Sequence, residues 1–358
     1  MTDTVRVKFF AKGIRQDVVA IWSRQLPGSE GRWGNVQFLF DLDARDYDWL
    51  VVYDDLPPVG AERFSSWVEE LACPRERTIF VTAEPSTIKI YSAGFLSQFG
   101  WVITSQEPWA VARHPRVIHR LPGLRWFYGA PSGWEEHPER LLSWDQIAKA
   151  QPFDKQHDLA TVTSSKAMAV TEHAARIEFV RRLNQDLPQF ELFGRGIRPI
   201  SDKSEALDGY RYHLAIENHI CDHHITEKLT DAFLGGCLPF YFGAPNTAEY
   251  FPADSFIPID IHDYPAALAL IEEAIRNNAY ERHIDAIREA RRLVLEKYNL
   301  FAILASLIDE TSPSLEDATR GGQVMGRHLY RRRHPLSLFS ELLAKTRARR
   351  RYARERLA

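Results

Sequence analysis

Residues 217–228 bring together side chains that could bind an anion. The segment reads Glu-Asn-His-Ile-Cys-Asp-His-His-Ile-Thr-Glu-Lys and holds eight acidic, basic, imidazole or amide side chains. Thr226 is suited to cap a helix, which would place Glu227 and Lys228 in its first turn. The helix dipole disfavours a lysine there, by up to about 1 kcal/mol, unless a bound anion reverses the effect. We therefore predict a phosphate site formed by Lys228 and the free backbone N–H groups of the helix.

Two residues outside this segment could complete such a site. Glu84 comes just after the apolar residues 78–82 and is followed by a proline, a position suited to a general base. Arg176 lies in a helical pattern, from which a guanidinium could reach a diphosphate opposite Lys228. Structural roles remain open: a helix start for Glu84, a solvated helix surface for Arg176, a turn for Asn218 and pairing with a nearby acid for Lys228.

Two groups of potential metal ligands lack support. Residues 41–43 form an Asp-Leu-Asp triplet, but such triplets are frequent by chance and no further ligand accompanies this one. The other group consists of His219, Asp222, His223 and His224. Their spacing does not match that of a standard metal site. We therefore expect no metal site.

Apolar and β-branched stretches predict the strands of a first α/β domain. They are residues 5–10, 49–52, 78–82 and 101–104. Helical spacing between the last two strands, at Ile88, Tyr91, Phe95 and Phe99, predicts a βαβ unit. Residues 108–158 are rich in Pro, Gly, Trp and His, and we expect them to be loops that close this domain.

The second half alternates strands and helices more clearly. Strands are expected at residues 159–164, 190–193, 212–216 and 237–242, with helices at 174–183, from Thr226 through Phe233, and beyond Asp263. Ligands of parallel α/β sheets gather beyond the carboxyl ends of the strands, which favours the loops that hold Glu84 and residues 217–228. We predict two α/β domains, residues 1–155 and 156–310, and a C-terminal tail, residues 311–358.

Composition restricts the class of protein. The 358 residues are 45% apolar and 26% charged, as expected of a folded chain with two domains. No apolar run reaches the roughly 18 residues of a membrane span, and the N-terminus lacks the pattern of a secretory signal, so we expect a cytoplasmic protein. Three cysteines without CxxC spacing argue against a disulfide framework and for buried thiols.

The tail combines basic charge with an apolar stripe. Residues 327–358 hold eleven Arg or Lys against two Glu, a charge of +9, so the rest of the chain is at about −12 and does not fit a nucleic-acid-binding protein. The apolar residues with helical spacing are Leu336, Leu338, Phe339, Leu342 and Leu343. This pattern predicts a helix that docks on an anionic membrane surface. A solvated tail or a nucleic-acid contact is the alternative.

Residues 210–257 resemble the donor-binding signature of a known family. The motif runs Tyr210-Arg-Tyr-His-Leu-Ala-Ile-Glu-Asn218, then Thr226-Glu-Lys-Leu229, then Pro239-Phe-Tyr-Phe-Gly-Ala-Pro-Asn246. This long, ordered motif is similar to that of the GDP-fucose-dependent α-1,3/4-fucosyltransferases of the bacterial type, glycosyltransferase family 10. Weaker similarity covers most of residues 155–300, whereas the N-terminal half matches only around residues 79–86.

The resemblance implies a GT-B fold, in which two Rossmann-like α/β domains face each other across a cleft that holds the active site. Family members transfer L-fucose from GDP-fucose with inversion and use no metal held by an Asp-x-Asp motif. Carried over by position, Glu84 resembles the catalytic base, Arg176 and Lys228 the diphosphate-binding cations, and Asn218 and Glu227 further donor contacts. The implied acceptor is a glycan hydroxyl, with α-1,3 linkage to a lipopolysaccharide or a related oligosaccharide.

His224 departs from the family pattern. The family has tyrosine at this position, so a donor contact through a phenolic hydroxyl becomes a contact through imidazole. The same chemistry with a different nucleotide sugar is therefore one alternative. A catalytically silent carbohydrate-binding protein is another, although the joint presence of a base and two phosphate-binding cations argues against it.

Overall fold

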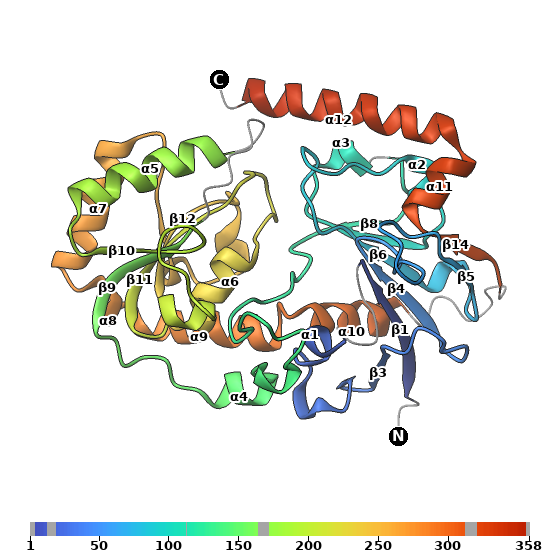
Figure 1. Ribbon diagram of the computed structural model, residues 1–358, viewed down its shortest axis with the longest axis horizontal. Coiled ribbons are helices and arrows are strands. Elements are labelled where there is room, and N and C mark those ends of the chain that lie inside the picture. Colours follow the sequence, from blue (N-terminus) through green and yellow to red (C-terminus); the bar gives the residue numbers. More distant parts are fainter. Residues whose placement is uncertain (1–3, 13–18, 112, 164–171, 312–320, 356–358) are drawn as a thin grey trace. The chain divides into compact units, whose positions relative to one another are not determined.

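The structure is a computed structural model that describes residues 4–12, 19–111, 113–163, 172–311 and 321–355. The chain forms two α/β units, which contain parallel sheets (Figure 1). The first unit contains Met1–Pro122 and Leu300–Ala358, and the second contains Gly123–Asn299. The predicted α/β class with two sheet domains and a C-terminal helical segment is confirmed.

A seven-stranded sheet forms the centre of the described part of the first unit. Its order is β2-β3-β1-β4-β6-β7-β8, and neighbouring strands are parallel except β2 and β3. All residues of β4 and β6 are buried, because strands at the centre of a parallel sheet are covered on both faces. The strands of this unit, including the separate antiparallel pair β5 and β14, are β1 (Val5–Ala11), β2 (Arg32–Trp33), β3 (Val36–Leu39), β4 (Trp49–Tyr53), β5 (Val68–Glu70), β6 (Thr78–Val81), β7 (Trp101–Thr104), β8 (Val117–His119) and β14 (Gln323–Met325).

Most helices of the first unit are short, and the longer ones come from the end of the chain. They are α1 (Ala20–Ser23), α2 (Ala93–Leu96), α3 (Pro108–Val111), α10 (Leu300–Thr311), α11 (Arg327–Arg333) and α12 (Pro335–Glu355). The helix expected around residues 88–99 is reduced to α2. Lys89 and Tyr91 are held instead by a carboxylate oxygen of Asp54, at 2.6 and 2.7 Å, and Ser92 caps the helix only after them.

The second unit is built on a parallel sheet of five strands within its described residues. The order is β10-β9-β11-β12-β13, so the chain passes from β9 to one side and then returns to the other. The strands are β9 (His157–Val162), β10 (Phe190–Phe193), β11 (Tyr210–Ile216), β12 (Leu238–Phe242) and β13 (Ile257–Pro258). The space beside β9 at its carboxyl end is therefore a topological switch point, the usual ligand position in such sheets.

Helices cover both faces of this second sheet (Figure 1). The helices are α4 (Trp144–Lys149), α5 (His173–Asp186), α6 (Glu227–Leu234), α7 (Tyr264–Arg276), α8 (Ala279–Arg282) and α9 (Ile284–Glu296). Phe179 and Leu183 of α5 and Ile271 of α7 pack with Leu214 and Phe240 of the sheet in one apolar core. Burial of each such side chain stabilises the fold by roughly 1.5–3 kcal/mol. This packing fixes the first turn of α5, which carries Arg176.

The first of the two boundaries between the units lies between Pro122 and Gly123, and not near residue 155 as expected. Residues from Gly123 onward belong to the second unit because their polar groups bond to it. The hydroxyl of Tyr128 donates to Asp208 at 2.9 Å, and the backbone N–H of Phe127 donates to Asp231 at 3.2 Å. The predicted loops thus close the second unit instead of the first.

The second boundary lies at residues 299–300, and not at 310. Helix α10 joins the first unit because Phe301 packs against Phe9 and Phe38, with ring centroids 5.4 and 4.8 Å apart. The expected separate tail likewise belongs to the first unit from residue 321 onward. Part of its expected span, residues 312–320 and 356–358, lies outside the described residues.

Helix α12 has two different faces. Glu341, Ala348 and Tyr352 are buried, whereas Leu336 and Phe339 are 86% and 63% exposed. Glu341 accepts hydrogen bonds from Arg327 and from the backbone N–H of Ser92, so the helix is anchored beside α2 (Figure 1). A cavity of about 320 Å³ lies along this seam, and its lining includes Ile90, Trp109, Val111, Leu343 and Ala344.

Candidate functional site

A slot opens between β9 and β11 at their carboxyl ends. The register pairs the two strands as far as Ala160 and His213. Beyond this point Thr161 donates its hydroxyl to the carbonyl of Leu214 at 2.8 Å, and the strands separate. The resulting cavity has a volume of about 30 Å³ and is lined from β9, α5, β11, α6 and the turn at Lys203. The slot therefore lies at the topological switch point of the sheet.

The start of α6 forms one side of this site. Thr226 is the N-cap, and its hydroxyl accepts a hydrogen bond from the backbone N–H of Lys228 at 3.3 Å, which confirms the predicted cap. Thr226 in turn donates its own N–H and hydroxyl to the fully buried carboxylate of Glu217, each at 2.8 Å. The cap is thus locked to the end of β11.

Lys228 is paired with two carboxylates. Its Nζ lies 3.2 Å from Glu217 and 3.4 Å from Glu227, and the side chain keeps 22% of its surface exposed. Burial alone would lower the pKa of Lys228, but the two carboxylates raise it above its ordinary value. The acid pairing left open from the sequence is therefore present, and it holds a charged ammonium beside the slot.

Glu227 is ionised by its surroundings. Burial tends to raise the pKa of this carboxyl, but Lys228 and Lys203 outweigh it and bring the pKa down to about 2. Glu217 behaves oppositely, since complete burial raises its pKa above the ordinary value while Lys228 only partly opposes this. As the pH falls, Glu217 is therefore protonated before Glu227.

Arg176 forms the other side of the site. It is only 8% exposed, so it is not the solvated helix arginine left open from the sequence. Its Nη1 donates to Asn218 Oδ1 at 2.8 Å, and the backbone carbonyl of Asn218 accepts from Glu172 at the start of α5. Arg176 Nε is buried and has no hydrogen-bond partner in the structure. Burial lowers the pKa of Arg176, and the nearby Glu217 and Glu227 oppose this effect.

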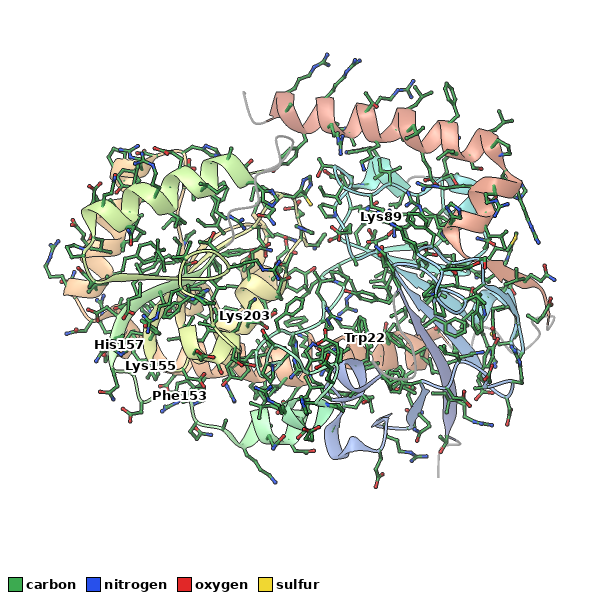
Figure 2. The ribbon with its side chains drawn as sticks, in the orientation of Figure 1. Trp22, Lys89, Phe153, Lys155, His157 and Lys203 are labelled. Carbon is green, nitrogen blue, oxygen red and sulfur yellow. The ribbon has the colours of Figure 1, made fainter. Side chains whose placement is uncertain are left out.

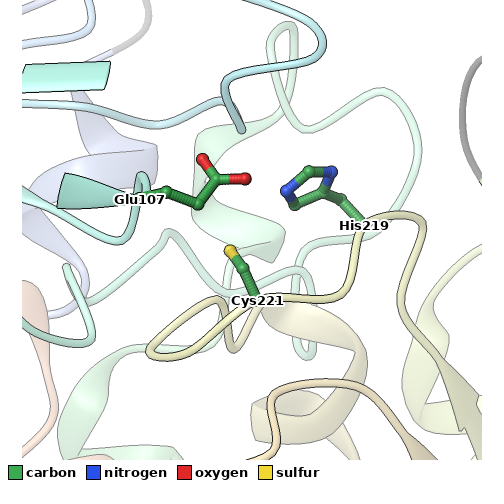
Figure 3. A group of neighbouring side chains, drawn as sticks. All are labelled: Glu107, His219 and Cys221. Atoms are coloured by element: carbon green, nitrogen blue, oxygen red, sulfur yellow. The ribbon is translucent and has the colours of Figure 1, made fainter. Parts of the chain in front are cut away.

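The loop after β11 holds His224 away from the surface. His224 is 5% exposed, and its ring lies edge-on to that of His219 at 5.7 Å. Figure 3 shows His219 and Cys221 on this loop; Glu107, also drawn there, belongs to the first unit. Cys73 and Cys237 are buried as predicted, but Cys221 is half-buried. Within either unit by itself, the described residues contain no cluster of three potential metal ligands.

Glu84 lies in the first unit, in the loop after β6. Its side chain is exposed, and its backbone carbonyl accepts a hydrogen bond from Gln106 Nε2 at 2.7 Å. Gln106 also donates to the carbonyl of Lys89 at 2.8 Å, so one amide side chain holds both ends of the loop. The structure therefore brings together Arg176, Asn218, Glu227 and Lys228 within the second unit, whereas Glu84 belongs to the other unit.

Sequence reasoning missed two polar residues that line the slot. Lys203, labelled in Figure 2, lies in a short 3-10 turn (Lys203–Ala206) and pairs with Asp231 of α6 at 2.8 Å. His213 lies inside β11, where only the alternating apolar residues had been considered. An imidazole within a buried strand was the available signal, while nothing in the local sequence marks Lys203.

The N–H groups in the first turn of α6 are engaged within the chain, so the free N–H groups expected from the sequence are not present. Cations beside a helix start at the switch point of a parallel sheet are typical of α/β domains that bind nucleotide phosphates. Residues 153–286 match the family model described as Glycosyltransferase family 10 (fucosyltransferase) C-term. The second unit thus carries the C-terminal domain of glycosyltransferase family 10, which confirms the resemblance recognised in the sequence.

Curated relatives match only part of the chain. The Homo sapiens 4-galactosyl-N-acetylglucosaminide 3-alpha-L-fucosyltransferase 9 is 33% identical over 113 residues, which are 30% of this chain and 31% of the relative. The Xenopus laevis GDP-fucose protein O-fucosyltransferase 3 is 34% identical over 96 residues, 26% of this chain and 20% of the relative. The chain thus matches less than a third of the length of either relative.

Among solved structures, one titled as an alpha1,3-fucosyltransferase with GDP-fucose is similar over 84% of this chain and 94% of its own, with 16% identity and a TM-score of 0.43. WaaG, titled as a glycosyltransferase involved in lipopolysaccharide biosynthesis, is similar over 86% and 99%, with 12% identity and a TM-score of 0.40.

Proposed function

We propose that the chain is a glycosyltransferase that moves L-fucose from GDP-fucose to a hydroxyl of a glycan, with inversion at the sugar. The observation that supports this most directly is the group of Arg176, Asn218 and Lys228 around the switch point, inside the segment that matches family 10. The two curated relatives are fucosyltransferases, which agrees with this donor.

The proposed reaction divides its work between the two units. Glu84, as a carboxylate, accepts the proton of the attacking acceptor hydroxyl. The acceptor oxygen bonds to C1 of fucose while the bond from C1 to the diphosphate oxygen breaks, and GDP leaves with the electron pair. Arg176, Lys228 and the N-terminus of α6 stabilise the charge that develops on the diphosphate.

Calorimetric titration with GDP, UDP and CMP tests the donor site. We expect GDP to bind the wild-type chain and to bind Arg176→Ala about a hundredfold more weakly, because the diphosphate loses a buried charged partner. Arg181→Ala is the matched control, because Arg181 lies on the same helix, is exposed and bonds only within that helix among the contacts described. Preference for UDP or CMP would overturn the fucosyl donor, and absence of nucleotide binding would overturn the transferase.

His224 supports a second candidate, the same reaction with another nucleotide sugar. Its imidazole is buried beside His219, so it offers a smaller polar group than a tyrosine. Under this alternative, His224→Tyr improves turnover of GDP-fucose, whereas under the first candidate the wild-type chain already hydrolyses GDP-fucose slowly without acceptor. Product analysis against a panel of sugar nucleotides separates the two.

The proposed acceptor is a lipopolysaccharide or a related oligosaccharide, linked α-1,3, with no divalent cation required. Linkage analysis of the product identifies the acceptor position, and assays with and without a chelator test the cation requirement. Turnover that falls in the chelator and returns with added Mg²⁺ or Mn²⁺ would overturn the metal-free mechanism.

Helix α12 supports the further proposal of a cytoplasmic protein that docks on an anionic membrane. Leu336, Phe339 and Leu342 form an exposed apolar face, and basic residues follow them along the helix. No helix in the described part of the chain is long and apolar enough to cross a membrane. We expect sedimentation with phosphatidylglycerol vesicles but not with phosphatidylcholine vesicles, and loss of that binding in the double variant Leu336→Ser, Phe339→Ser.

A further inference from the structure

His213 lines the slot and carries a hydrogen-bonding atom without a partner in the structure. The residue is 6% exposed and lines the cavity between β9 and β11 together with Arg176, Lys203 and Lys228. Its Nδ1 is buried and has no hydrogen-bond partner in the structure. Buried polar atoms normally have a partner, so an atom of this kind at a ligand position indicates that the partner comes from outside the chain.

The other side of the ring fixes the role of Nδ1. The imidazole hydrogen-bonds the backbone of Ala206, and because Nδ1 is unpartnered, Nε2 makes this bond as the N–H donor. Burial, followed by the charge of Lys203, lowers the pKa of His213 to about 3, so the ring is neutral at pH 7. A neutral imidazole that donates through Nε2 accepts through Nδ1. The slot therefore offers an acceptor among three cations.

The size of the slot limits what can enter it. Its volume of about 30 Å³ is enough for a water molecule or a hydroxyl group. A donor hydroxyl fits this volume and has the hydrogen that Nδ1 requires. The cations beside it suit the diphosphate of the same ligand, which would lie outside the slot.

We propose that His213 is a donor-specificity residue, whose Nδ1 accepts a hydrogen bond from a hydroxyl of the nucleoside diphosphate sugar. The hydroxyl belongs either to the ribose or to the transferred sugar, and it displaces a water from the slot. This inference rests on the proposed function of the same site and adds a residue that recognises the sugar portion of the ligand, where Arg176 and Lys228 recognise charge.

Two variants separate this role from a structural one. The amide oxygen of His213→Asn reaches the position of Nδ1, whereas the amide of His213→Gln reaches that of Nε2 and keeps a donor for Ala206. We expect KM for GDP-fucose to rise about tenfold in His213→Gln, with kcat within twofold of wild type, and to stay within threefold in His213→Asn. A purely structural role predicts the reverse order. His157→Gln, in the same sheet but away from the slot, is the control.

Calorimetry with three ligands identifies the hydroxyl. Weaker binding of GDP itself by His213→Gln assigns the ribose, and binding that weakens for GDP-fucose but not for GDP assigns the sugar. GDP with both ribose hydroxyls replaced by hydrogen should bind wild type and His213→Gln equally in the first case. Equal KM and affinity in wild type and His213→Gln would show that the slot holds only a water and would overturn the inference. Failure of the wild-type chain to bind GDP would instead overturn the proposed function.

Discussion

The carboxyl edges of the two sheets are used in different ways. In the second unit, β9 and β11 separate and leave a slot beside Arg176 and Lys228. In the first unit, the residues after β4 are occupied by the chain itself, since Asp54 accepts from Lys89 and Tyr91 and Asp55 accepts from the backbone N–H of Arg327 at 2.9 Å. Similar parallel sheets can thus leave this edge open to a ligand or close it with their own helices.

The first test of this comparison concerns Glu84, whose side chain is exposed in the loop after β6 of the first unit. Glu84→Gln should lower kcat by about 10²–10⁴-fold and leave GDP affinity unchanged, because the amide cannot accept the acceptor proton. Steady-state kinetics and calorimetry measure the two quantities. Glu62→Gln, an exposed glutamate of the same unit, is the control. A kcat within a few-fold of wild type would remove Glu84 from the reaction.

The open edge should be sensitive to loss of a cation. Arg176→Ala should reduce kcat/KM for GDP-fucose by about 10²–10³-fold, because a preorganised contact to the departing diphosphate disappears. The thermal midpoint should change little, since the described partner of this guanidinium is the neutral Asn218. Equal effects of Arg176→Ala and the exposed Arg181→Ala would contradict a special role of this edge.

In the first unit, we expect loss of a buried contact to lower the stability of the fold. Glu341→Gln should lower the free energy of unfolding of the first unit by about 2 kcal/mol, because Arg327 and Arg331 lose a buried charged acceptor. Urea unfolding measures this, and hydrogen exchange should show faster exchange in α12 while α6 is unchanged. Glu310→Gln, an exposed residue of α10, serves as the control. Unchanged protection of α12 would mean that Glu341 does not anchor it.

The smallest expected effect is a pH dependence at the open edge. The pKa of Glu227 is lowered from 4.5 to about 2, so its contribution to stability is complete above pH 4.5 and is lost as the pH falls from 4.5 to 2. In Glu227→Gln, the loss of stability at acid pH should be smaller by about 1 kcal/mol, because this contribution of Glu227 is absent. The effect is small because Glu217, whose pKa is raised, changes the stability in the opposite direction as the pH falls. An acid limb as steep as that of wild type would place the titration elsewhere.

Much of the second unit could be predicted from the sequence because its signals are local. The alternation around residues 210–242 gave β11, α6 and β12, and the Thr226 cap follows from residue type and position alone. Arg176 and Lys228 could be named for the same reason. Their burial and mutual arrangement could not be predicted. Both depend on tertiary contacts, in which Asn218 binds Arg176 of α5 and Glu217 binds Lys228 of α6.

The errors fall where tertiary contacts decide the outcome. Residues 123–152 have little periodicity, and bonds such as Tyr128 to Asp208 assign them to the second unit. The helix expected at residues 88–99 is shortened because Asp54, which is distant in sequence, holds Lys89 and Tyr91. Lys203 escaped notice because its place in the slot depends on the path of the chain after β10.

The division of the chain also has a consequence for its synthesis. The second unit is one continuous segment, Gly123–Asn299, so all of it can leave the ribosome and fold while later residues are still being added. The first unit folds completely only later, because α10, α11 and α12 are translated after the whole second unit and include Phe301 of its core and Glu341 of its anchor. Synthesis of the first unit therefore starts before that of the second unit, but we expect the first unit to complete its folding later.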